Sequence, residues 1–355
     1  MSELRVRSSS GEYPIHLARG SFDALLDRLH DPILIADERF RDRVGDRPAA
    51  FVTATEANKT VAEGARLIEA LHALGARRGT PVVALGGGIV QDVATLTASL
   101  YMRGLPWAYA PTTLASMADS CIGGKSSINV GAVKNLAGNF FPPREVAIDP
   151  DFIATLAPAD IVNGLAEAAK IAYCRGAEAY ERYEQLAAAF AFGADLDAGA
   201  QLLEHVLKAK TWFIEVDEFD RAERRLLNLG HTFGHALEAA VGHRVQHGVA
   251  VALGVRAAIT TAREHDGRDG VLRARLDAHC AQLAGDVPGL GAALGHFDRA
   301  AFTRALLGDK KHTQTELRLI LPLPEGGAQE IGLPRDQESN SRLLTALQGA
   351  MGEVR

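Results

Sequence analysis

The stretch Pro81-Val-Val-Ala-Leu-Gly-Gly-Gly-Ile-Val-Gln-Asp92 decides the fold class of this chain. Its continuous apolar run is typical of a strand that is buried on both faces of a parallel sheet. The three glycines and the helical residues after them would bring backbone N–H groups and a helix N-terminus to the end of that strand, an arrangement that binds phosphate. A tight turn fits the same residues, because the pattern is not the dinucleotide fingerprint G-x-G-x-x-G.

Further strands and helices are predicted on both sides of this stretch. Apolar spacing predicts a helix over 61–74, and short apolar runs predict strands over 13–17, 32–36, 49–53 and 107–110. This alternation predicts a Rossmann-like α/β domain over residues 1–150. Asp37 stands directly after one predicted strand, at the sheet edge where open α/β sheets bind ligands.

Helices dominate the predicted second domain, residues 151–355. Further amphipathic helices are predicted over 269–285 and 298–308, followed by a small hairpin over 316–322 and 329–332.

Glu167 and Lys170 lie at i, i+3 on one face of an otherwise apolar helix of this domain. Burying a carboxylate and an ammonium together is costly unless they pair, bind a metal or take part in chemistry. A half-exposed ion pair is the alternative interpretation.

A histidine-rich segment, Arg224-Arg-Leu-Leu-Asn-Leu-Gly-His-Thr-Phe-Gly-His-Ala-Leu-Glu238, is predicted to be helical. His231 and His235 then lie on one face, one turn apart. The two glycines of the segment would let another backbone or a ligand come close. His247 follows at a new helix start, and three histidines with a buried carboxylate elsewhere indicate a divalent metal, zinc, with an open ligand position. A capping or packing role for the histidine pair is the alternative.

A glycine-rich stretch with lysines, Asp119-Ser-Cys-Ile-Gly-Gly-Lys125, is followed by Lys134-Asn135. Such a cluster of donors on an acidic protein predicts a bound anion, such as a phosphate or a carboxylate. A solvated loop with ordinary surface lysines fits the same pattern.

Composition limits the classes of function. The chain has 355 residues, 47% of them hydrophobic and 23% charged, which fits a globular protein of two domains. A net charge of −6 argues against a general nucleic-acid or anionic-membrane binder. The first residues lack an apolar signal core, and no run of about 18 apolar residues predicts a membrane span. Cys121, Cys174 and Cys280 are widely spaced, which predicts a reduced, cytoplasmic protein.

In their joint order and spacing, these segments resemble the 3-dehydroquinate synthase family of sugar phosphate cyclases across nearly the whole chain. The segments that carry the resemblance are Gly86-Gly-Gly-Ile-Val-Gln-Asp92, Tyr101-Met-Arg-Gly104, Pro111-Thr-Thr113, Asp119 to Lys125, Lys134-Asn135, Gly164-Leu-Ala-Glu-Ala-Ala-Lys170, Arg224 to His235, His247-Gly248 and Asp309-Lys-Lys311. The resemblance implies an α/β N-terminal domain that binds NAD and a mostly helical C-terminal domain that binds a metal. It also implies a site in the cleft between them.

The resemblance implies roles for individual residues. Its metal ligands are Glu167, His231 and His247, holding Zn2+ with Co2+ as an alternative. Its cofactor-binding positions are Asp37, Glu56, Lys59, Gly86, Gly87, Gly88, Asp92, Thr112, Thr113 and Lys134. Its substrate positions are Asp119, Lys125, Asn135, Lys170, Lys210, Arg224, Asn228, His235 and one or both of Lys310 and Lys311. Arg103 would come from the neighbouring subunit of a homodimer.

The implied reaction converts 3-deoxy-arabino-heptulosonate 7-phosphate to 3-dehydroquinate plus phosphate. Transient oxidation by NAD, phosphate elimination, re-reduction and an intramolecular aldol step would follow one another. The chain departs from the family pattern at Gln91, Val130, Asp220 and Val249, which leaves room for another sugar phosphate cyclase acting on a heptulose phosphate in a specialised pathway. A metal-dependent polyol dehydrogenase and a nucleotide-binding module without catalysis are the remaining alternatives.

Overall fold

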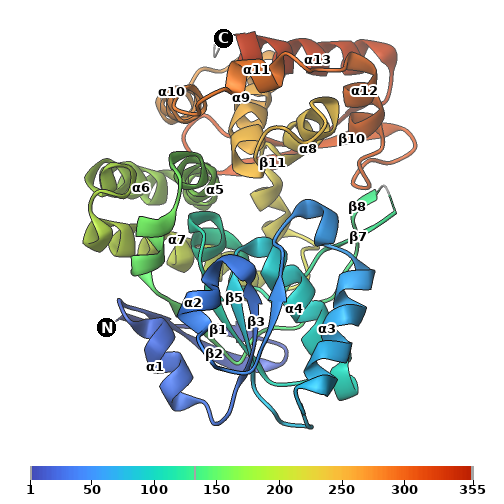
Figure 1. The fold of residues 1–355 in the computed structure, drawn as a ribbon. Coiled ribbons are helices and arrows are strands. Elements are labelled where there is room, and N and C mark those ends of the chain that lie inside the picture. Colours follow the sequence, from blue (N-terminus) through green and yellow to red (C-terminus); the bar gives the residue numbers. More distant parts are fainter. Residues whose placement is uncertain (1, 132, 353–355) are drawn as a thin grey trace. The chain divides into compact units, whose positions relative to one another are not determined.

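Residues 2–131 and 133–352 are described in the computed structural model, which divides into two compact units (Figure 1). The first unit comprises Met1–Leu156 and Asp195–Phe219, and the second comprises Ala157–Ala194 and Asp220–Arg355. Among the described residues, none of the helices combines the length and the apolar character that crossing a bilayer requires.

A seven-stranded sheet forms the core of the first unit, in the order β1-β2-β9-β6-β5-β3-β4. Its strands are β1 (Ser2–Ser8), β2 (Gly11–Leu17), β3 (Ile33–Asp37), β4 (Ala49–Val52), β5 (Val82–Gly86), β6 (Trp107–Pro111) and β9 (Glu145–Ile148). Only the β1–β2 pair is antiparallel; the other pairs of this sheet are parallel. Every residue of β3, β5 and β6 is buried, so the prediction of buried parallel strands is confirmed.

The helices of the first unit are α1 (Ser21–Arg28), α2 (Arg41–Val44), α3 (Val61–Ala73), α4 (Gly88–Leu100) and α7 (Leu196–Val216). Only Gly87 separates strand β5 from helix α4, which packs against it. The segment that follows the glycine-rich stretch Asp119–Lys125, for which no strand is predicted, contains a hairpin, β7 (Ile128–Val130) with β8 (Val133–Ala137). The prediction missed this hairpin, because its strands are short and largely exposed and so lack the apolar alternation of a half-buried strand.

Helix α7 explains why the compact units differ from the predicted division at residue 150. It packs against β1 and against two short helical segments, Ser116–Ser120 and Pro150–Thr155. Lys210 on α7 therefore belongs to the first unit, although it lies within the predicted second domain. The separate binding of cofactor and metal by two domains stays a prediction.

Helices dominate the second unit. They are α5 (Pro158–Arg175), α6 (Ala177–Phe190), α8 (His231–Ala240), α9 (His247–Asp266), α10 (Val271–Gly285), α11 (Leu290–Leu294), α12 (Arg299–Leu307) and α13 (Gln337–Gly352). The hairpin of β10 (Glu316–Pro322) and β11 (Ala328–Pro334) completes the unit and confirms the predicted late hairpin. Helix α9 is buried along most of its length because α5, α8, α10 and α13 all pack against it.

Glycines bring the backbones of α8 and α9 into contact. A Cβ atom on Gly254 would lie 2.1 Å from the carbonyl oxygen of Gly230. The predicted close approach at the histidine segment is therefore confirmed, and the approaching group is the backbone of α9. The prediction of one continuous helix over 224–238 is wrong, because Glu223–Asn228 forms a separate 3-10 turn. Gly230 has a φ of 78°, so α8 begins only at His231.

A buried polar contact joins α6 to α10. The Tyr183 hydroxyl donates to the carbonyl oxygen of Leu165 at 3.0 Å and lies 2.9 Å from Nε2 of His279. Burial lowers the pKa of His279 from 6.5 to about 4. Between the two pKa values, His279 therefore stays neutral in the folded protein but is protonated in the unfolded chain.

Acid should destabilise the protein through His279. The unfolding free energy should be highest above pH 6.5 and fall as the pH drops from 6.5 to 4, the window between the unfolded and folded pKa values. His279→Gln should make this loss smaller by on the order of 2 kcal/mol. Urea unfolding of both proteins at several pH values, in the presence of a chelator, measures this loss of unfolding free energy. Equal pH slopes for the two proteins would contradict the assignment.

Candidate functional site

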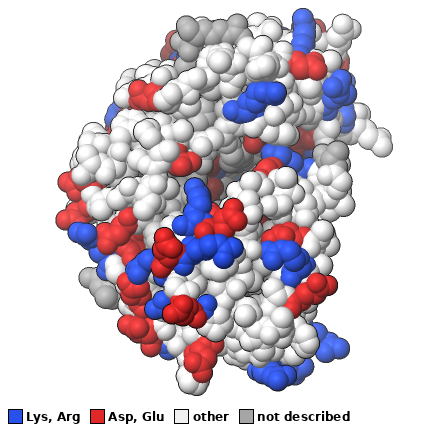
Figure 2. Space-filling view, viewed as in Figure 1, with Lys and Arg blue, Asp and Glu red and all other residues white. Residues whose placement is uncertain are grey.

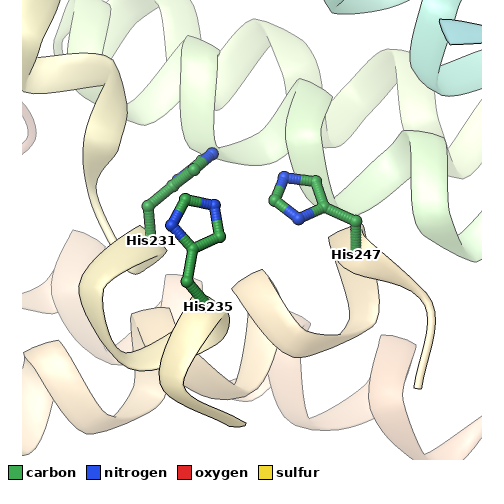
Figure 3. Close-up of side chains that lie close together, drawn as sticks. All are labelled: His231, His235 and His247. Carbon is green, nitrogen blue, oxygen red and sulfur yellow. The ribbon is translucent and has the colours of Figure 1, made fainter. Parts of the chain in front are cut away.

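Three histidines meet where α8 and α9 pack together, as Figure 3 shows. His231 and His235 come from successive turns of α8, and His247 is the first residue of α9. One ligand nitrogen from each lies within 4.8 Å of the others. The predicted convergence of the histidine pair with His247 is therefore present in the structure.

Glu167 adds a buried carboxylate to this cluster from helix α5. Its Oε1 lies 3.4 Å from Nε2 of His247 and 4.0 Å from Nε2 of His231. Its Oε2 lies 2.6 Å from Nζ of Lys170, and both side chains are almost fully buried. Oε2 is thus paired with Lys170, whereas Oε1 has no hydrogen-bond partner among the described residues. A buried carboxylate oxygen without such a partner, facing two imidazoles, fits a metal ligand.

The other ring nitrogens of the histidines hold these imidazoles in place. Nδ1 of His231 lies 3.2 Å from the carbonyl oxygen of Leu229, and Nδ1 of His247 lies 3.3 Å from Oε2 of Glu238. Metal-binding histidines commonly donate their second ring N–H in this way, which leaves the other nitrogen for the metal. Both Nε2 atoms remain directed at Glu167.

The protonation states of the histidines differ within the cluster. Burial lowers the pKa of His231 well below 6.5, and the positive charge of Lys170 lowers it further. Burial also lowers the pKa of His235 to about 4. Burial acts to lower the pKa of His247 too, but the hydrogen bond that its ring donates to Glu238 and the charge of Glu167 raise it overall. Two neutral imidazoles are thus available near neutral pH, the form in which histidine binds a metal.

One carboxylate and two imidazoles form a ligand set that is chemically suited to catalytic zinc with an open position. Glu167, His231 and His247 therefore fit the predicted metal. His235 lies close enough to belong to the same set. Its placement on the substrate side stays a prediction.

A hydrogen bond joins the loop Asp309-Lys-Lys311, which follows α12, to helix α8. Thr232 on α8 donates a hydrogen bond to Oδ2 of Asp309 at 3.2 Å, and Oδ1 of Asp309 accepts from the backbone N of Lys311. The charge of Lys311 lowers the pKa of both His231 and His235, whereas Lys310 is exposed. Of the two predicted lysines, Lys311 is the one brought to the histidine cluster.

Arg224 and Asn228 lie in the 3-10 turn that precedes α8. Arg224 is buried, with 6% exposure, and Asn228 donates to the carbonyl oxygen of Arg225 at 3.0 Å. Their contact with a substrate stays a prediction.

In the first unit, a polar network surrounds the start of α4. Nζ of Lys59 lies 2.7 Å from Asp92 and donates to Oδ1 of Asn135 at 2.9 Å. Glu56 accepts from Asn129 at 2.8 Å and lies 3.5 Å from Nζ of Lys134. These contacts join the predicted cofactor residues of α4 and the loop after β4 to the β7–β8 hairpin.

The glycines after β5 leave the N-terminus of α4 open. A Cβ atom on Gly86 would lie 2.6 Å from Val90, and one on Gly87 would lie 3.0 Å from Thr113. No side chain of the described residues caps the first turn of α4, for which Gly87 is the N-cap. Free N–H groups and the helix dipole at such an end attract a phosphate group.

A cavity of about 490 Å³ lies in the first unit, beyond the carboxyl ends of β3, β6 and β9. Its lining includes Arg39, Phe40, Thr112, Asp149, Phe152 and Thr155. Oγ1 of Thr112 is buried and has no hydrogen-bond partner among the described residues. The nearby carboxylate of Asp37 is held by Arg39 through bonds of 2.9 and 3.1 Å to Oδ2.

This position is the crevice where parallel α/β sheets bind nucleotides. The rings of Phe40 and Phe152 and the unpartnered hydroxyl of Thr112 are suited to binding a nucleoside. The sequence prediction missed Arg39, Phe152 and Thr155, since only the folded sheet brings residues 149–155 beside the end of β3.

Buried Lys210 forms an ion pair with half-buried Asp119 within the first unit. Nζ of Lys210 lies 2.5 Å from Oδ1 of Asp119 and also donates to the Asp119 carbonyl oxygen. Gln91, which departs from the family pattern, holds the adjacent Ser120 by two hydrogen bonds of 2.6 and 2.7 Å. The other departures are spread over both units: Val130 is exposed in the β7–β8 hairpin, Val249 is buried in α9, and Asp220 has a φ of 60°.

Lys125 and Arg103 are both exposed. Arg103 lies in a turn where Met102 and Arg103 have positive φ angles of 48° and 68°. Backbone strain of this kind is concentrated at functional segments, but its presence alone assigns no function to Arg103.

On the face that Figure 2 shows, acidic and basic side chains are interspersed.

Family models match most of the chain. Residues 49–163 match the model described as 3-dehydroquinate synthase N-terminal, and residues 164–312 match 3-dehydroquinate synthase C-terminal. The chain is 35% identical over 306 residues to a 3-dehydroquinate synthase of Paracoccus denitrificans, covering 84% of this chain and 81% of that protein. It is 36% identical over 272 residues to a 2-epi-valiolone synthase of Stigmatella aurantiaca, covering 68% and 67%. It is also 38% identical over 204 residues to a 3-dehydroquinate synthase of Latilactobacillus sakei, and this match covers 58% of this chain and 57% of that protein.

Solved structures share the whole fold. A 2-epi-5-epi-valiolone synthase from Streptomyces hygroscopicus, with NAD+ and Zn2+ bound, aligns with a TM-score of 0.77 at 24% identity and 99% coverage of both chains. A 2-deoxy-scyllo-inosose synthase complexed with carbaglucose-6-phosphate, NAD+ and Co2+ aligns with a TM-score of 0.77 at 20% identity, covering 98% of this chain and 99% of that chain. The parallel α/β sheet with a mostly helical second part is therefore the fold of these cyclases.

Proposed function

Because the chain belongs to the 3-dehydroquinate synthase family, we propose that it converts 3-deoxy-arabino-heptulosonate 7-phosphate to 3-dehydroquinate and phosphate. The observation that carries this proposal is the buried carboxylate of Glu167, whose Oε1 has no hydrogen bond from the described residues and faces His231 and His247. NAD and a divalent ion, zinc or cobalt, are the proposed cofactors.

Glu167, His231 and His247 would hold the metal, which when bound lowers the pKa of substrate hydroxyls and polarises a neighbouring carbonyl. Lys170 places a positive charge beside the proposed metal site. Its ammonium, 2.6 Å from Oε2 of Glu167, offsets one carboxylate charge and is the proposed donor to an oxygen of the substrate. His235 and Lys311, next to the ligand histidines, are the proposed donors to the substrate from the same unit.

The first unit would bind the cofactor at the ends of its parallel strands. The uncapped N-terminus of α4 suits the pyrophosphate, and the cavity at Thr112 suits the adenosine. Bound NAD would supply transient oxidation of the substrate and would be regenerated within one cycle, so no net change of NAD is expected.

The substrate carries a phosphate and a carboxylate, which need cationic partners. The proposed partners are Lys125, Lys210, Arg224 and Lys311. Preorganised cations of this kind stabilise the negative charge that develops as phosphate leaves.

The proposed activity is tested by incubating the metal-loaded protein with the heptulosonate phosphate and NAD. We expect release of phosphate in step with formation of dehydroquinate, identified by mass spectrometry, without accumulation of NADH. Folded, zinc-loaded protein that gives no turnover would reject this substrate.

A second candidate function has one specific observation in its favour, the similarity to a 2-epi-valiolone synthase. A heptulose 7-phosphate that lacks the carboxylate therefore belongs in the same assay. Faster cyclisation of this sugar than of the heptulosonate would select the second candidate. Net formation of NADH with a simple polyol would instead identify a dehydrogenase.

We also propose a cytoplasmic homodimer in which Arg103 completes the site of the neighbouring subunit. The three cysteines are free and buried, as expected for a reduced compartment. Arg103→Ala and Glu167→Gln should each be inactive alone. Co-expressed in equal amounts, they should recover about a quarter of wild-type activity, because half the dimers are hybrids with one intact site. No recovery would place Arg103 in its own subunit's site.

A further inference from the structure

The last turn of α8 carries a carboxylate that points back to the start of α9. Glu238 is buried, with 8% exposure, three residues after His235 and seven after His231. Its backbone carbonyl oxygen accepts from the N–H of His243 at 2.7 Å, which closes the helix end. Gly242 and His243 have φ angles of 59° and 58°, and this tight turn returns the chain to His247.

The two proposed ligand histidines differ in what holds them. Nδ1 of His231 faces the neutral carbonyl oxygen of Leu229 at 3.2 Å. Nδ1 of His247 faces the charged Oε2 of Glu238 at 3.3 Å. A carboxylate partner fixes the ring and also makes the opposite nitrogen a stronger ligand, because it stabilises positive charge on the imidazole.

We propose that Glu238 is a positioning residue for the metal site. Its carboxylate accepts a hydrogen bond from Nδ1–H of His247 and so holds Nε2 of the same ring toward Oε1 of Glu167, 3.4 Å away. This inference rests on the metal site of the proposed function. It assigns to Glu238 a role that none of the predicted site residues has.

Metal affinity of the whole protein is the direct test. The metal is removed with a chelator, and Zn2+ is titrated against a chromophoric competitor. Glu238→Gln keeps the size of the side chain and removes its charge, and we expect it to weaken Zn2+ binding by about 10- to 100-fold. Glu264→Gln is the matched control: it makes the same chemical change on α9, at a carboxylate that pairs with Arg342. This control should bind Zn2+ as wild type does.

A double-mutant cycle separates positioning from a general effect on the fold. Once His247→Ala has removed the imidazole, Glu238→Gln should cause no further loss of affinity. Additive losses, or wild-type affinity in Glu238→Gln, would overturn the proposal. If Glu238→Gln fails to fold, Glu238→Asp replaces it: the shorter carboxylate keeps the charge but loses reach, and it should weaken binding without lowering the Tm of the metal-free protein. Wild-type protein that binds no Zn2+ would instead reject the proposed function.

Discussion

Replacing Glu167 with glutamine should weaken metal binding by more than about a hundredfold, since even losing a residue that only orients a ligand costs about 10–100-fold. Turnover should fall by at least about a thousandfold, because the metal's contribution to lowering the barrier is several kcal/mol and each 1.36 kcal/mol is tenfold. Chelator competition and phosphate release measure the two effects. The carboxylate is buried, and its Oε1 faces both proposed ligand histidines.

Stability gives an independent readout of the same substitution. Glu167→Gln removes the charge that pairs with Lys170 at 2.6 Å, and breaking a buried pair costs about 3–5 kcal/mol. Adding Lys170→Met should restore most of this stability in urea unfolding and none of the metal affinity. If the double variant recovered metal binding, Glu167 would be a structural partner of Lys170 and not a ligand.

Substituting Gly254 with alanine should be the most damaging single-methyl change in the second unit. The new Cβ would lie 2.1 Å from the carbonyl oxygen of Gly230, a distance at which α8 and α9 must move apart. We expect a loss of about 3 kcal/mol or more in the unfolding free energy. Since His231 begins α8 and His247 begins α9, metal affinity should fall as well.

Gly349→Ala on α13 is the control for this prediction. Its Cβ would meet nothing within 4 Å, so the substitution should be neutral or stabilise the helix by up to about 1 kcal/mol. Thermal unfolding and Zn2+ titration of both variants test the contrast. Wild-type stability of Gly254→Ala would mean that the two helices separate without cost.

Continuous apolar runs and helical spacing predicted much of the fold. The runs that became β3, β5 and β6 are buried on both faces, so they read as strands without any knowledge of their neighbours. The hairpin of β10 and β11 was predicted for a similar reason. Helix α8 was predicted to begin too early, because the turn before it has helical composition and only the left-handed conformation of Gly230 separates them.

Contacts that depend on distant segments could not be predicted from local pattern. Glu238 stands on the same face of α8 as the histidines, and this spacing was a signal for a role beside them. Its partner is His247, which the turn at Gly242 brings next to it. The helical spacing of apolar residues does not predict this turn. The cavity at Thr112 likewise depends on residues 149–155 lying beside the sheet edge.

Helix α7 has a consequence for the biosynthesis of the protein. The chain leaves the first unit after Leu156, returns to it at Asp195 and leaves again after Phe219. A nascent polypeptide emerging from the ribosome therefore cannot complete its first unit when the sheet strands have been translated. Residues 157–194 must be synthesised before α7 is available to pack against β1. A fragment ending at Leu156 should therefore bind chaperones and should not fold on its own.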